Sequence, residues 1–170
     1  DVIEEYLAKE WQNCFVRIVR QEMEEKMGLD EDDETFDKDT LAILESSKGV
    51  SVISKIFLDI LLNGKAESRT DAAYNIGIVA KFSPLSCYKK YAIKMAGALI
   101  RIANDKFDDE MKITIFRALR RMFEKAGIVM KPMAAPLKTT FSQYSKNKEV
   151  STEVINEMEK LKEAVEATTK

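Results

Sequence analysis

The chain has 170 residues, of which 45% are hydrophobic and 33% are charged, and its net charge is −2. Lys or Arg interrupts every apolar run before it reaches the ~20 residues that a membrane span needs, and the acidic first residues do not resemble a secretory signal. The absence of His removes the most common general base and the most common metal ligand.

The composition favours an all-helical chain. Gly and Pro, the strongest helix breakers, occur only 6 and 3 times, while Leu, Ile, Met, Ala, Lys and Glu are abundant. The length suits one domain with a packed core. Because the first residue is not Met and the chain opens in an apparent helix, we expect a segment of a larger protein.

The first part of the chain predicts a long amphipathic helix followed by an acidic loop. Apolar residues recur every three or four positions over residues 2–27, and Gly28 can end the helix. Trp11 lies within this stripe and suits either the core or a contact with a partner. Residues 30–39 are nearly all acidic, so we expect a mobile loop there. The predicted organisation is therefore a helix at 1–29, a loop at 30–39 and a packed domain at 40–170.

The rest of the chain predicts shorter amphipathic helices separated by turns. We expect them at residues 40–47, 51–62, 66–81, 84–103, 108–126, 133–145 and 152–167. Gly49 is the expected interruption between the first two, and Ser83 is the expected N-cap of the helix that contains Pro84. Asp108 and the two acids that follow it suit a helix cap and dipole better than a metal site.

Two of these helices open with similar patterns. The residues that follow Arg69 match those that follow Lys112, at an offset of about 43, which lies within the ~40–47-residue period of HEAT and armadillo repeats. We therefore predict an all-α fold, a HEAT/armadillo-like right-handed superhelix of stacked antiparallel helix pairs. The expected pairs cover about 51–82, 84–126 and 131–168. A helical bundle without repeats is the alternative.

Four runs within residues 61–141 also resemble a known family. They are LNGKAE at 62–67 with the alanines that follow it, GALIRIANDKF at 97–107, KAGIVMKP at 125–132 and PLKTTF at 136–141. Their order and spacing resemble those of the large HEAT-repeat translational activators of the general control pathway. Gly97-Ala98 departs from the Gly-Pro of that family, the repeat after Phe141 lacks its expected features, and residues 1–49 match no part of it.

This resemblance implies a function in translation. It implies a cytoplasmic protein that senses stalled ribosomes and activates the kinase of initiation factor 2 under amino-acid starvation. In later repeats of the family it also implies contact with the N-terminal RWD domain of that kinase. It implies no catalytic residue, so we expect no enzyme.

Charge is distributed unevenly along the chain. The net charge is −9 over residues 1–48 and +9 over residues 84–148. The candidate contact residues are Lys89, Lys90, Lys94, Arg101, Arg117, Arg120, Arg121, Lys125, Lys131 and Lys138. Four of them, from Arg117 to Lys125, follow three-and-four spacing and share one helix face. This basic block suits ribosomal RNA or an acidic protein, while a solvated face or pairing within the array are alternatives.

We therefore expect a non-catalytic scaffold that holds a ribosome and a kinase together. We expect no cofactor, metal, small-molecule substrate, DNA or membrane partner. Cys14 and Cys87 are far apart among apolar neighbours and are expected to be buried thiols. The alternative function is a HEAT-repeat adaptor in transport or cytoskeletal assembly.

Overall fold

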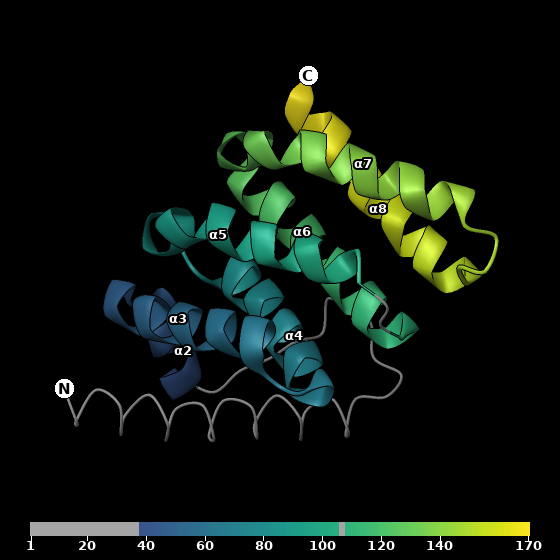
Figure 1. Cartoon of the computed structure of the whole chain (residues 1–170). Coiled ribbons are helices and arrows are strands. Elements are labelled where there is room, and N and C mark those ends of the chain that lie inside the picture. Colours follow the sequence, from purple (N-terminus) through teal and green to yellow (C-terminus); the bar gives the residue numbers. More distant parts are fainter. Residues whose placement is uncertain (1–37, 106–107) are drawn as a thin grey trace.

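The structure, a computed structural model, describes residues 38–105 and 108–170, where it consists of helices and short turns (Figure 1). The helices are α2 (Lys38–Glu45), α3 (Ser47–Asn63), α4 (Ala66–Phe82), α5 (Leu85–Ala103), α6 (Asp109–Ala126), the 3-10 helix η1 (Gly127–Met133), α7 (Ala134–Lys146) and α8 (Thr152–Thr169). The predicted all-α class is confirmed. The predicted helix at 1–29, most of the acidic loop, Trp11 and Cys14 lie outside the described residues.

The helices form three pairs that stack on one another. Figure 1 shows the blue α3–α4 pair, the teal α5–α6 pair and the green and yellow α7–α8 pair in succession. Neighbouring pairs pack through α4, α6 and α8 on one side and through α3, α5, η1 and α7 on the other. We call α3, α5, η1 and α7 layer A, and α4, α6 and α8 layer B. Two layers of stacked helix pairs are the arrangement of HEAT-like repeats.

One apolar core runs through the whole stack. Phe57 and Ile76 in the first pair, Leu99 and Phe116 in the second, and Leu161 in the third are each at most 1% exposed. Burying side chains of this size stabilises the fold by ~1.5–3 kcal/mol each. Each pair therefore covers an apolar face of the next pair, which holds the stack in register.

The two layer B helices α4 and α6 approach each other closely at Gly77. A Cβ atom at this position would lie 3.2 Å from the Cα of Ala118, which is closer than ordinary van der Waals contact. Gly77 therefore allows a close approach of two backbones, which is one reason for glycine within a helix.

Two turns differ from the sequence prediction. The break between α2 and α3 lies at Ser46, whose hydroxyl accepts a hydrogen bond from the Gly49 backbone N–H at 3.2 Å. Gly49, the predicted interruption, instead lies in the first turn of α3. Ser83 is the C-cap of α4, and Pro84 takes the N-cap position of α5. Both predictions failed because turn-forming residues mark a break only to within a few positions.

The ends of α6 agree with the prediction. The Asp108 side chain accepts a hydrogen bond from the Met111 backbone N–H at 2.9 Å, and Asp109 and Glu110 lie in the first turn. Gly127 ends the helix with a φ of 38°, a positive value that glycine adopts more readily than residues with a side chain. The chain then continues through η1 before α7 begins at Ala134.

Candidate functional site

Layer A carries a concentrated positive charge. Its helices contain nine basic residues and one acidic residue, Asp59. All nine basic side chains are exposed: Lys48 and Lys55 on α3, Lys89, Lys90, Lys94 and Arg101 on α5, Lys131 on η1, and Lys138 and Lys146 on α7. We call them the layer A cations. Within the described residues none of them forms an ion pair.

Layer B contains as many basic residues but balances them. Its helices hold nine Lys or Arg and ten Asp or Glu residues. Ion pairs join oppositely charged side chains there, such as Arg120 with Glu124 at 4.0 Å and Lys162 with Glu159 at 3.4 Å. The two layers therefore differ in net charge by nine units, +8 against −1, although both are helical and similar in size.

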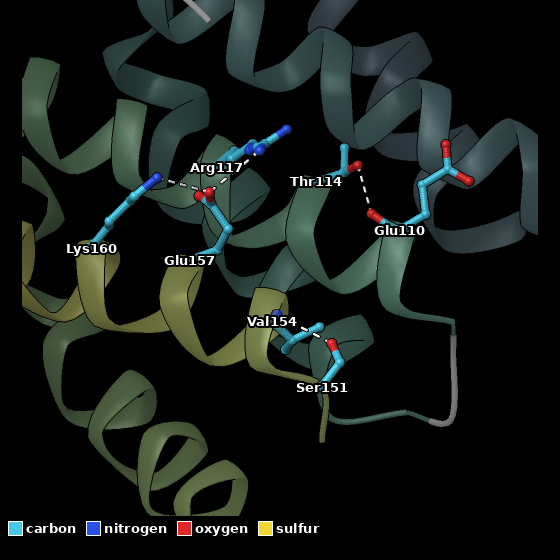
Figure 2. A network of polar contacts seen from close by, with 7 residues as sticks. All are labelled: Glu110, Thr114, Arg117, Ser151, Val154, Glu157 and Lys160. Atoms are coloured by element: carbon cyan, nitrogen blue, oxygen red, sulfur yellow. Dashed lines mark hydrogen bonds and ion pairs between the residues drawn. The ribbon is translucent and has the colours of Figure 1, made fainter. Parts of the chain in front are cut away.

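One charge network of layer B joins α6 to α8. Figure 2 shows Arg117 of α6 and Lys160 of α8 converging on the carboxylate of Glu157. Arg117 Nη2 and Lys160 Nζ lie 3.3 Å and 3.0 Å from Glu157 Oε1. The Glu157 side chain is only 7% exposed. Burial on its own raises the pKa of Glu157, but hydrogen bonds and charges from Lys160 and Arg117 outweigh it and hold the pKa below its ordinary value of 4.5.

The outward side of α5 forms a continuous basic ridge. Lys90, Lys94, Gly97 and Arg101 are four, three and four residues apart, so they share one helix face, and all four are exposed. We call these four residues the α5 ridge. At 1.5 Å per residue the ridge is roughly 16 Å long. The helix contains no acidic residue.

A hydrogen bond joins α3 to α5 beside the α5 ridge. Ser51 of α3 and Tyr91 of α5 share a hydrogen bond of 2.5 Å between their hydroxyl groups, and Lys90 Nζ lies 5.2 Å from the centre of the Tyr91 ring. The Ser51 hydrogen bond, followed by the influence of Lys90 and Lys55, lowers the pKa of Tyr91 against the opposing effect of burial. Cations from both helices therefore act on one phenol.

The structure divides the ten predicted contact residues between the two layers. Six of them, Lys89, Lys90, Lys94, Arg101, Lys131 and Lys138, are layer A cations. The other four, Arg117, Arg120, Arg121 and Lys125, belong to α6 in layer B. Arg121 is only 9% exposed and its Cδ lies near Gly77 of α4, while 16% of the Arg120 side chain is exposed. Arg121 therefore cannot belong to an exposed basic face, because the face it shares with Arg117 turns partly toward the core.

Three layer A cations were missed by the sequence prediction. Lys48 and Lys55 fell in sequence blocks with an acidic or nearly neutral balance, and Lys146 was not singled out. The sequence does show these three cations when charge is counted by layer. In an array of helix pairs every second helix lies in the same layer. Summing charge over alternate helices, instead of over contiguous blocks, would have assembled all nine.

Other kinds of site find little support in the described residues. No group of three or more side chains there could hold a metal ion. No helix in the described ranges is long and apolar enough to cross a membrane. Cys87 is buried, as predicted, with its Sγ 3.4 Å from Ser47 Oγ and 3.6 Å from the Glu45 carbonyl oxygen.

The stacked pairs and the net positive charge of layer A define the class of the chain, an all-α HEAT-like repeat array with a basic layer. It is similar to three curated proteins, each matched over about 4% of the length of the relative. The human "Stalled ribosome sensor GCN1" is 30% identical over 96 residues, or 56% of this chain. "Protein ILITYHIA" of Arabidopsis thaliana is 32% identical over 94 residues, or 55% of this chain. The "eIF-2-alpha kinase activator GCN1" of Saccharomyces cerevisiae is 28% identical over 101 residues, or 59% of this chain.

These similarities confirm the resemblance that four short sequence runs suggested. No protein-family model and no solved structure matches the chain. The relationship to these proteins is therefore seen in sequence alone, and the HEAT-like arrangement is seen in the packing of the helices.

Proposed function

We propose that this chain is a non-catalytic scaffold module of a translational activator that binds ribosomes and promotes activation of the kinase of initiation factor 2. The observation that carries this proposal is the similarity over 96 residues to a protein named as a stalled ribosome sensor. The yeast relative, named as an activator of the eIF-2-alpha kinase, supports the second half of the proposal. The expected setting is the cytoplasm of cells under amino-acid starvation or ribosome stalling.

The structure suits a positioning mechanism. The continuous core makes the array a firm support, and its two layers offer faces of different charge. Layer A, with nine exposed cations, fits a large polyanion such as a ribosome. A kinase, contacted through its RWD domain, would then be held near the ribosome. Binding two partners at once raises their effective concentration to the millimolar range for short connections, without new chemistry.

Co-sedimentation with purified ribosomes tests this function. We would compare the wild type with Lys94→Glu/Lys138→Glu, which reverses two layer A cations on different helices. The matched control is Lys162→Glu/Lys170→Glu, which makes the same change in net charge at α8 of layer B. The wild type and the control should sediment with ribosomes, and the layer A variant should remain in the supernatant.

Two results would contradict the proposal. The first is a wild-type chain that does not sediment with ribosomes. The second is an equal loss for both variants, since this would make net charge, and not the layer A surface, the cause of binding. Capture of the RWD domain of the kinase by the wild-type chain tests the second partner separately.

A further inference from the structure

We propose that the α5 ridge, together with the flanking layer A cations of α3 and α7, binds the phosphate backbone of double-helical RNA without reading its bases. This inference rests on the proposed function and names the ligand that the basic face would contact on a ribosome. Four properties of the ridge support it: its charge, which forms no ion pair within the described residues, its lack of exposed large hydrophobic side chains, its lack of exposed aromatic rings, and the glycine in its middle.

The charges of the ridge are available to an external ligand. No acidic residue occurs on α5, η1 or α7. The one acid of layer A, Asp59 on α3, accepts a hydrogen bond from Asn63 at 2.8 Å. Over the roughly 16 Å of the ridge, a nucleic-acid strand with one phosphate per ~3.4 Å of axis presents about five phosphates. Three cations spaced along this length can therefore contact separate phosphates of one strand.

The surface composition favours a nucleic acid over a protein partner. Protein interfaces are enriched in aromatic residues, Met and Arg, and depleted in Lys, whereas Lys and Arg both serve as phosphate contacts. Eight of the nine layer A cations are Lys. Within the described residues the exposed large hydrophobic side chains are Leu62 and Ile128, which lie on α3 and η1 of layer A and not on α5. The ridge therefore lacks the apolar centre that a protein interface needs.

The same surface lacks the groups that read single-stranded bases. Sequence-specific recognition of RNA uses aromatic rings on which splayed bases stack. Tyr91, the aromatic residue beside Lys90, is half-buried, and Ser51 holds its hydroxyl group. The surface can therefore contact the phosphate backbone of a duplex, and such contacts carry little sequence information.

Gly97 indicates a close approach by the ligand. Glycine weakens a helix interior relative to alanine, so its presence there calls for a reason. Packing within the chain does not explain the glycine, because a Cβ atom at Gly97 would meet nothing within 4 Å. Backbone conformation does not explain it either, because the glycine with positive φ in the described ranges is Gly127. The missing side chain of Gly97 leaves a notch between Lys94 and Arg101, and this notch would let a phosphate or ribose approach the helix backbone.

Binding to a short RNA duplex tests the charge of the ridge. The variant is Lys90→Gln/Lys94→Gln/Arg101→Gln, and the control is Lys65→Gln/Lys162→Gln/Lys170→Gln, which removes three cations elsewhere. The ridge variant should bind ~10–100-fold more weakly near physiological salt, and its salt dependence should fall by about 2 in log–log slope. The control should bind within about twofold of the wild type, and so should duplexes of different sequence. Equal affinity of wild type and ridge variant overturns the inference.

Gly97 provides a test that leaves every charge in place. Gly97→Leu fills the notch and should weaken duplex binding by about tenfold, whereas Gly97→Ala adds one small group and should bind within about twofold of the wild type. Circular dichroism of each variant verifies that the helices form. Wild-type affinity in Gly97→Leu would show that the ligand does not approach the α5 backbone.

The inference and the proposed function can fail separately. If the wild type sediments with ribosomes but binds no RNA duplex, the ribosome contact is made to protein and the inference is wrong. If the wild type binds duplex RNA through the ridge but does not sediment with ribosomes, the inference holds and the proposed function is wrong.

Discussion

The side chain of Asn75 is fully buried in α4, and neither its amide nitrogen nor its amide oxygen has a hydrogen-bond partner among the described residues. Burying such a group without a partner costs ~1–3 kcal/mol. Leu is similar in size and has no polar atom. We therefore predict that Asn75→Leu raises the free energy of unfolding by about 1 kcal/mol, measured by urea denaturation.

Asn75→Asp is the control for this prediction. It keeps the shape of the side chain but places a carboxylate in the same apolar site, so it should lower the stability at neutral pH. A decrease in stability for Asn75→Leu would contradict the prediction.

At the scale of elements, Glu157 links α6 and α8 through Arg117 and Lys160. Folding lowers the pKa of Glu157, so its contribution to stability is fully present above its ordinary value of 4.5 and is lost as the pH falls through the lower folded value. Glu157→Gln removes the charge. We predict that it lowers the free energy of unfolding by about 1 kcal/mol near neutral pH and that this difference shrinks on acidification below about pH 4.5.

Glu159→Gln is the matched control for the α6–α8 link. Glu159 and Lys162 also form an ion pair, but their side chains are 49% and 45% exposed, so the pair contributes at most ~0.5 kcal/mol. Denaturation curves of both variants over a range of pH give the comparison. Equal effects of the two substitutions would contradict the assigned role of Glu157.

Helices were predictable from sequence because their signals are local. The apolar spacing of α6, the Asp108 cap and the Gly127 stop act within one or two turns, and the structure retains all of them. The positions of Ser46 and Ser83 were not predictable in the same way. Several residues near each turn favour an extended backbone, and tertiary packing selects one of them.

At the scale of the whole molecule, the basic face could be predicted only in part. Six of the ten expected residues lie in layer A because the basic block at 84–148 contains α5, η1 and α7, and the other four lie on α6, which the same block also contains. Arg121 shows the limit of this reasoning, since it lies on a helix that packs against both α4 and α8 and is buried there. The sequence shows that a residue is charged, but its exposure depends on contacts with the neighbouring pairs.

The stack also predicts how the molecule unfolds. Leu119 in the central pair and Leu161 in the last pair are both fully buried, and truncating either to Ala costs ~2–5 kcal/mol. Stability in such arrays is the sum of terms for each unit and its neighbours. Leu161→Ala should therefore speed amide hydrogen exchange mainly in α7 and α8 and leave α4 protected. Leu119→Ala should speed exchange in all three pairs, because α6 packs on both α4 and α8.

Hydrogen exchange measured by mass spectrometry shows whether the three pairs unfold as one unit or whether the last pair opens on its own. If both substitutions speed exchange equally in every helix, the three pairs unfold as one unit and nearest-neighbour stacking does not describe the chain. If Leu161→Ala acts locally, the α5 ridge keeps its structure while the last pair opens, because its helix packs on α3 and α6 as well as on η1. In that case RNA binding should be weakened but retained in Leu161→Ala, because the α7 cations are displaced while the α5 ridge stays in place, and it should be lost with Leu119→Ala.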